Sequence, residues 1–388
     1  MDASVERPLP GKAEQFSTRV IFFVAGFAMA AWAPLVPYAK ARVGADDATL
    51  GLVLLCLGAG SIVTMPVTAA LAARFGCRAV VEVATLILCA VLPVLAVAPN
   101  VPLLAAALFV FGAAIGTNDV TISIQAVIVE RASGRAMMSG FHGLFSIGGI
   151  AGAGCVSLLL WLGASPLTAT LCIAAVVLAL LLVCARYLLP YADDGEEPGF
   201  VVPHGLVLFI GCLCFIAFLA EGSMLDWSAV FLATRRAVAP AHAGLGYAAF
   251  AGAMTLGRLT GDRIVHALGP RAVLIFGALC AASGMALAVL APWWSAALAG
   301  FALVGLGASN IVPVFYTALG RQSAVPLNIA IATISVLGYL GILCGPALIG
   351  FVAQGTSLSI ALLGVAGLLL VVAASALAVT RGRVPAGS

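Results

Sequence analysis

The segment Phe75-Gly76-Cys77-Arg78-Ala79-Val80 separates two long apolar stretches, and Leu268-Gly269-Pro270-Arg271-Ala272-Val273 separates two others. The two segments stand 193 residues apart in a chain of 388 residues. Further residues recur near the same offset, namely Trp32 with Trp227, Gly112 with Gly305, and Asn118 with Asn310. The pattern predicts that the chain consists of one unit present twice, in the same orientation.

The composition places this repeat in a membrane. Hydrophobic residues make up 63% of the chain and charged residues only 9%, whereas soluble proteins carry about 25% charged residues. The net charge of +3 is small, and no basic run indicates a nucleic-acid partner. We therefore expect a lipid-embedded protein that binds no nucleic acid, is not an enzyme and acts as a monomer.

The apolar stretches are long enough to cross a bilayer as helices, which takes about 20 residues each. β-barrel alternation is absent, so a helical bundle is the spanning structure that remains. We predict an all-α membrane protein of two pseudo-symmetric six-helix bundles, with twelve spans at 18–39, 48–72, 79–98, 101–128, 137–162, 166–189, 204–232, 243–266, 272–291, 294–318, 327–353 and 357–380.

The basic residues predict the orientation. With both termini in the cytoplasm, 14 of the 18 Lys and Arg residues fall on the cytoplasmic side, as the positive-inside rule requires. The remaining four are Lys40, Arg42, Arg235 and Arg236. This predicts a cytoplasmic tail (1–17), a first bundle (18–189), an acidic cytoplasmic linker (190–203), a second bundle (204–380) and a cytoplasmic tail (381–388), in a bacterial inner membrane.

The loop after the second span resembles a family signature. Leu71-Ala72-Ala73-Arg74-Phe75-Gly76-Cys77-Arg78 is similar to the loop between helices two and three of the major facilitator superfamily, with Ala73 where the family has an acid. The second copy keeps an acid, in Gly261-Asp262-Arg263. The resemblance covers the whole chain. It implies a secondary transporter whose two bundles rock about a site near the midplane.

A finer resemblance points to a bacterial branch near the fucose–proton symporters. It is carried by Trp32-Ala33-Pro34, Asp119, Val129-Glu130-Arg131, His142-Gly143-Leu144-Phe145-Ser146, Ala220-Glu221-Gly222-Ser223 and Gly257-Arg258-Leu259-Thr260-Gly261-Asp262. In those symporters an acid on helix four takes part in proton coupling, and Asp119 occupies a similar place. The acid that they also use on helix one has no counterpart in 18–39.

Ionisable residues inside the spans are the first candidates for function, because a charge at the bilayer centre costs at least about 2.5–3.5 kcal/mol. Asp119 lies eleven residues before Glu130, which puts it roughly 16 Å from the cytoplasmic end of its helix. Nearby Asn118, Ser123 and Gln125 suggest a wet cavity, where Asp119 could load and release a proton. Glu221 and His142 are the other candidates for proton coupling, and no other cofactor is expected.

A transporter of this kind also needs a substrate pocket and a gate. For the pocket we predict polar and aromatic residues near mid-depth, namely Trp32, Asn118, Ser123, Glu221, Asp226, Trp227, Tyr247, Asn310, Phe315 and Tyr316. Asp226 is also a candidate for contact with Lys40, Arg235 or Arg236. For the cytoplasmic gate we predict Arg74, Arg78, Glu82, Glu130, Arg131, Arg258, Asp262 and Arg271, with ion pairs four residues apart in Arg78–Glu82 and Arg258–Asp262. Pro34 and Pro37, Pro313, and the glycines of spans five and eleven suggest kinked helices, and Gly222 suggests a loosened span seven.

Other chemistry finds no support in the sequence. No Gly-Lys-Ser/Thr loop for phosphate occurs, the ten cysteines lie mostly within apolar stretches, and no metal-ligand spacing is present. The leading hypothesis is a proton-coupled transporter of a small organic solute. Proton-driven efflux of amphipathic compounds stays open as an alternative, as does a non-transporting sensor on a transporter fold.

Overall fold

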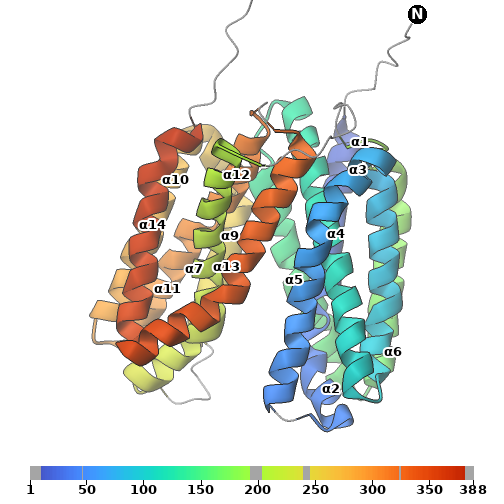
Figure 1. The fold of residues 1–388 in the computed structure, drawn as a ribbon, viewed down its shortest axis with the longest axis horizontal. Coiled ribbons are helices and arrows are strands. Elements are labelled where there is room, and N and C mark those ends of the chain that lie inside the picture. The colour runs from blue at the N-terminus through green and yellow to red at the C-terminus, as the bar shows by residue number, and fades with distance from the viewer. Residues whose placement is uncertain (1–9, 46, 193–202, 239–244, 323–324, 381–388) are drawn as a thin grey trace, which may run out of the picture.

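The computed structural model describes residues 10–45, 47–192, 203–238, 245–322 and 325–380. The first nine residues of the predicted N-terminal tail, most of the predicted linker and all of the predicted C-terminal tail lie outside these residues. The described chain is helical, and Figure 1 shows two bundles side by side. Helix α1 (Lys12–Ala30) begins and α14 (Leu358–Thr380) ends at the same end of the molecule, which we call the terminal face. The other end is the opposite face.

The first bundle contains α1, η1 (Ala33–Leu35), α2 (Val36–Val43), α3 (Asp47–Val97), α4 (Val101–Ser133), α5 (Met138–Trp161), α6 (Pro166–Cys184) and η2 (Ala185–Tyr187). The second contains α7 (Leu206–Arg235), α9 (Leu245–Leu268), α10 (Pro270–Leu290), α11 (Trp294–Ala308), α12 (Ile311–Leu319), α13 (Leu327–Gly355) and α14.

These helices make the twelve spans. Ten helical runs among the described residues are long and apolar enough to cross a membrane, and one of them, Leu52–Val97, has 46 residues and holds two crossings. The division lies at Gly76, whose φ of 78° interrupts α3. The twelfth span is α9, which is less apolar because it carries Arg258, Asp262 and Arg263.

Gly76 could not be another residue without a local rearrangement. A Cβ built on it would lie 2.1 Å from the carbonyl oxygen of Pro190, and its positive φ is a conformation that L side chains rarely adopt. The chain after η2 packs against this turn, where Arg78 N–H donates to Leu189 O at 2.8 Å. The repeat segment is thus a tight reversal between two spans.

Helix contacts repeat between the bundles. In the first, α1 packs on α5, and the two parts of α3 pack on α4 and α6; in the second, α7 packs on α13, and α10 packs on α11 and α14. The bundles meet through α3 with α13 and through α5 with α9. These two interfaces occupy equivalent places in the repeat, so the duplication seen in the sequence is also present in the packing.

The irregularities predicted at Pro34 and Pro313 are present as breaks. Helices α5, α7 and α13 run unbroken, so the glycines in these spans do not interrupt them. In α5 they allow close packing instead, because a Cβ on Gly148 or Gly152 would lie 2.1 Å from a carbonyl oxygen of α1. Span ten is broken between α11 and α12, just before Pro313. Span one is broken at η1, where Pro34 lacks the N–H for a regular helical bond.

Candidate functional site

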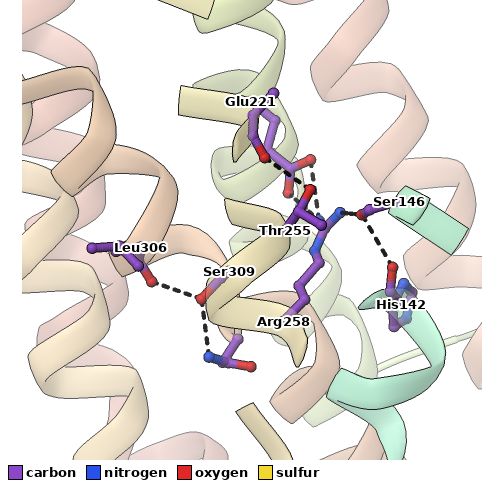
Figure 2. Close-up of polar contacts among 9 residues, drawn as sticks. His142, Ser146, Glu221, Thr255, Arg258, Leu306 and Ser309 are labelled. Atoms are coloured by element: carbon purple, nitrogen blue, oxygen red, sulfur yellow. Dashed lines mark hydrogen bonds and ion pairs between the residues drawn. The ribbon is translucent and has the colours of Figure 1, made fainter. Parts of the chain in front are cut away.

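Arg258 and Glu221 form an ion pair at about mid-depth of the second bundle (Figure 2). Arg258 lies ten residues from the end of α9, and Glu221 lies fifteen residues into α7. The Nη2 atom of Arg258 donates to both carboxylate oxygens of Glu221, at 3.1 and 3.4 Å. The two side chains are 12% and 16% exposed. The predicted Arg258–Asp262 pair is therefore wrong, because the long Arg258 side chain extends away from the terminal face, where Asp262 has other partners.

Arg258 also connects the two bundles. Its Nη1 donates to the Ser146 hydroxyl of α5 at 3.1 Å, and that hydroxyl donates to the His142 carbonyl at 3.1 Å (Figure 2). The Nε atom of Arg258 is buried and has no partner. Because an unpartnered buried donor is costly, Arg258 retains one donor that a bound solute could satisfy.

His142 lies between aromatic rings from both bundles. Its ring centroid is 5.4 Å from that of Phe22 on α1 and 5.6 Å from that of Tyr316 on α12. Its Nε2 atom is buried without a partner. The Tyr316 hydroxyl is 2.9 Å from the Ser335 hydroxyl on α13. His142 thus adjoins Arg258 on one side and the hydroxyl pair on the other.

Asp119 lies at the far side of these hydroxyls. The half-buried Asp119 carboxylate on α4 lies close to the Ser335 hydroxyl. Either hydroxyl of the Tyr316–Ser335 pair can be the donor between them. Tyr339, one turn along α13, is also near Asp119. Glu221, Arg258, Ser146, His142, Tyr316, Ser335 and Asp119 therefore follow one another in space, and we call them the central chain. Hydrogen bonds join Glu221, Arg258, Ser146 and the His142 carbonyl, a ring contact joins His142 to Tyr316, and a hydrogen bond joins Tyr316 to Ser335 beside Asp119.

A second polar group holds the terminal face together around the start of α5. Glu130 of α4 accepts from the N–H groups of Met137 and Met138 at 2.7 and 2.8 Å, and from the Thr317 hydroxyl of α12 at 2.5 Å. Asp262 of α9 accepts from the N–H of Gly140 at 3.0 Å. The first N–H groups of a helix lack helical partners and carry partial positive charge. One acid from each bundle therefore binds the same helix end.

The other predicted gate residues lie in different places and make different contacts. The Arg78–Glu82 ion pair is confirmed at 3.0 Å. The guanidinium of Arg74 lies 5.1 Å from the ring centroid of Phe75, and Arg271 is exposed at the start of α10. A Cβ built on Gly320 would lie 3.2 Å from Nε of Arg131, so Arg131 lies against the second bundle. Arg258 is the residue of this set that lies at mid-depth.

Several predicted pocket residues are placed for packing rather than for a cavity. Asn118 donates to Thr85 inside the first bundle at 3.1 Å, and Asn310 donates to the Gly257 carbonyl at 3.2 Å. Gln125 donates to Thr18 and accepts from the Leu189 N–H, so it links three segments. Phe315 is fully buried. The sequence suggests a wet cavity around Asn118 and Gln125 because it does not show which side of a helix faces its own bundle.

The remaining predicted pocket residues lie in different surroundings. Ser123 is buried one turn from Asp119 and adjoins the Tyr316 hydroxyl. The indole N–H groups of Trp32 and Trp227 are buried without partners. Tyr247 lies near Glu221 and Arg258. Asp226 is exposed, and Arg236 donates instead to α10 carbonyls.

Sequence reasoning missed Ser146, Ser335 and Tyr339 as members of this site. Ser335 and Tyr339 are one helical turn apart in an apolar span, which is a signal that the same face carries both. Ser146 falls one turn after His142. Hydroxyls are common in membrane helices, so spacing alone does not separate these residues from others.

Comparison with known proteins agrees with this architecture. A model of the Major Facilitator Superfamily matches residues 20–236, more than half of the chain. An uncharacterised MFS-type transporter of Yersinia pestis is 58% identical over 373 residues, covering 96% of this chain and 97% of its own. Membrane protein MosC of Rhizobium meliloti is 31% identical over 371 residues, covering 93% of this chain and 89% of its own.

The fold has a solved counterpart. A crystal structure of the transporter FucP in the outward conformation superposes with a TM-score of 0.81 at 16% identity, over 95% of this chain and 98% of FucP. The repeat, the twelve spans and the match to the family model agree, and the chain belongs to the major facilitator superfamily.

Proposed function

We propose that this transporter moves a small polar organic solute by alternating access, coupled to a proton carried by Asp119. The observation that supports it is the central chain, which runs from Glu221 to Asp119 and draws on α4 and α5 of one bundle and α7, α9, α12 and α13 of the other. A solute that disturbs one end of this chain can affect the other end.

Asp119 suits the proton role because of its surroundings. In the part of the chain that the structure describes, its neighbours are hydroxyl groups of Ser335, Tyr316 and Tyr339, and no ion pair is formed with it. An acid without a cation at this depth is costly to keep charged. A proton would be bound while the site is closed and exchanged when Asp119 meets water.

Arg258 and Glu221 are the residues that we propose bind the solute. Arg258 has an unpartnered Nε, and the indole N–H groups of Trp32 and Trp227 are also unpartnered donors. A solute with hydroxyl or carboxylate oxygens would supply the acceptors. Such a solute would compete with Glu221 for Arg258, and that competition would link binding to the central chain.

The proposed conformation is closed at the terminal face. Hydrogen bonds between the bundles include Thr317 to Glu130, Gly140 to Asp262 and Arg258 to Ser146, all from mid-depth to that face. FucP, which was solved in an outward conformation, has the same fold. With the basic residues concentrated at the terminal face, both termini would be cytoplasmic in a bacterial inner membrane.

The test begins with a solute. A thermal-shift screen of metabolites at two pH values supplies a candidate. The screen includes fucose, because FucP of Escherichia coli is a fucose:proton symporter. In proteoliposomes, wild type should accumulate it when a pH gradient is imposed. Asp119→Asn keeps the shape of the side chain but cannot carry the proton.

The expected result is that Asp119→Asn loses accumulation but still exchanges labelled solute across the membrane. Glu14→Gln, which removes a carboxylate at the start of α1, is the matched control and should accumulate like wild type. Undiminished accumulation by Asp119→Asn would show that Asp119 is not the coupling residue.

A further inference from the structure

Arg42 binds the end of another helix at the opposite face. It lies near the end of α2, and its Nε, Nη1 and Nη2 atoms donate to the carbonyls of Ala98, Ala96 and Leu95 at 2.8, 2.6 and 2.7 Å. All three nitrogens of one guanidinium are thus engaged by the last residues of α3. Few side chains other than Arg can make such a contact, because it needs several donors in one rigid plane.

Two of the three carbonyls that Arg42 binds lack a helical N–H donor, because a proline stands four residues after each. In a helix, Leu95 O would accept from the N–H of residue 99, which is Pro99 and has none. Ala98 O would likewise face Pro102. The connection to α4 is three residues long, and its Ala98 N–H donates to Val94 O rather than to the carbonyls that Arg42 binds. Arg42 therefore satisfies groups that would otherwise be unpaired.

In the second bundle an arginine binds the equivalent helix end through one nitrogen of its guanidinium. Nη2 of Arg236, just after α7, donates to Ala288 O and Val289 O of α10 at 2.9 and 2.7 Å. These two carbonyls lie 193 residues after those of Leu95 and Ala96, which is the offset of the repeat, and Pro292 lies 193 residues after Pro99. Two of the four basic residues on the predicted outer side are therefore helix-end clamps.

The bundles differ in what the clamp holds. Helix α7 is continuous from Leu206 to Arg235, and it packs on α13, α14, α9 and α11. Helix α2 is eight residues long, lies beyond the break at η1, and packs chiefly on α3. Trp32 lies at this break. Loss of the clamp should leave α7 in place, whereas α2 could turn about the break.

We propose that Arg42 is a positioning residue that fixes α2 against α3 and thereby sets the opening of the first bundle at the opposite face. Arg236 is its structural twin, which stabilises a helix that is already held. The effect on transport rests on the proposed function, but the position of α2 does not. A distance measurement can therefore fail or succeed independently of any substrate.

The experiment places spin labels in a background without the ten native cysteines. One pair, at the exposed residues Tyr38 and Leu162, reports α2 against the rest of the first bundle. The equivalent pair, at the exposed residues Thr234 and Thr356, reports the end of α7. Pulsed electron paramagnetic resonance then gives a distance distribution for each pair.

Wild type should give one narrow distribution for each pair. Arg42→Ala should broaden or shift the Tyr38–Leu162 distribution and raise the KM for the solute found in the screen. Arg236→Ala should leave the Thr234–Thr356 distribution narrow and lower only the melting temperature. Arg42→Lys keeps the charge without the planar fork, so the width of its Tyr38–Leu162 distribution and its KM should lie between those of wild type and Arg42→Ala. This variant replaces Arg42→Ala if Arg42→Ala does not fold.

Two results would overturn the inference. One is an unchanged Tyr38–Leu162 distribution in both Arg42 variants, which would make the contact a stabilising cap only. The other is equal broadening in both bundles, because the break in span one would then not be what distinguishes them.

Discussion

Arg258 and Glu221 are a buried ion pair, and such pairs are retained for reasons other than net stability. Taking two charges out of water offsets most of their attraction, whereas removing one partner costs about 3–5 kcal/mol. Glu221→Gln should therefore lower the melting temperature in detergent markedly, since it leaves the Arg258 charge uncompensated. The double variant Glu221→Gln/Arg258→Met should recover stability without recovering transport.

The double variant decides between two roles. Recovered folding with lost transport means that the charges serve the site. A double variant that is no more stable than Glu221→Gln would mean that the pair contributes to the packing of α7 and α9 beyond its charge.

Gln125 gives a contrasting prediction at the same scale. It is fully buried and bridges the Thr18 hydroxyl of α1 and the Leu189 N–H after η2, at 2.9 and 3.1 Å. Gln125→Leu should lower stability, because each buried group left unpaired costs about 1–3 kcal/mol. The KM should not change, since the hydrogen bonds of Gln125 go to Thr18 and Leu189, which are outside the central chain. Thr18→Val, which removes one of the two hydrogen bonds, should lower stability by less than Gln125→Leu does. A changed KM in Gln125→Leu would contradict a purely structural role for Gln125.

Side-chain partners show what the sequence could and could not predict at this scale. Arg78–Glu82 was predictable because both residues are on one exposed turn of one helix. Arg258–Asp262 has the same spacing, yet each residue binds a different helix, since their neighbours come from 37 and 122 residues away. Candidates such as Asp119 and Glu221 follow from the cost of charge in lipid, whereas their partners require the packing.

At the scale of elements, the start of α5 is the contact on which closure of the terminal face depends. A Cβ built on Gly140 would lie 2.4 Å from Oδ2 of Asp262. Gly140→Val should therefore force α5 and α9 apart and favour the state that is open at the terminal face. The measurement is alkylation of a cysteine placed at the buried Ser139, which should become faster in inverted membrane vesicles.

Asp262→Asn is the comparison for that experiment. It keeps an oxygen acceptor but loses the charge that the helix start attracts, so alkylation should increase less than in Gly140→Val. If neither variant changes the rate, then the contact between α5 and α9 does not control this face.

Breaks and kinks were the least predictable feature of the elements. A glycine in a membrane helix allows a kink and also allows close packing, and in α5 the approach of α1 uses that freedom. Proline is more informative, because it always removes an N–H. The breaks in spans one and ten lie beside Pro34 and Pro313.

At the scale of the whole molecule, the duplication carried the prediction of the fold. Apolar length gave the twelve spans, and the offset of 193 gave two equal bundles. The repeat also orders the interfaces, since α3–α13 and α5–α9 are equivalent contacts. The repeat does not predict the differences between the bundles. Glu221, Arg258 and Asp119 have no equivalent residue in the other repeat, and the central chain depends on these three residues.

Alternating access requires the two bundles to separate at the terminal face, and a covalent bond between them there should prevent it. A Cβ built on Gly320, just after α12, would lie 2.8 Å from a methyl carbon of Val127 on α4, a spacing that suits a disulfide between two introduced cysteines. In the cysteine-free background, Val127→Cys/Gly320→Cys should transport when reduced and stop when oxidised. Solute binding from the opposite face should persist, because the bond holds the conformation described by the structure. Either single cysteine variant, treated with the same oxidant, should keep transporting. Continued transport with a complete cross-link would exclude rocking of the bundles at this face and would leave local helix movements to move the solute.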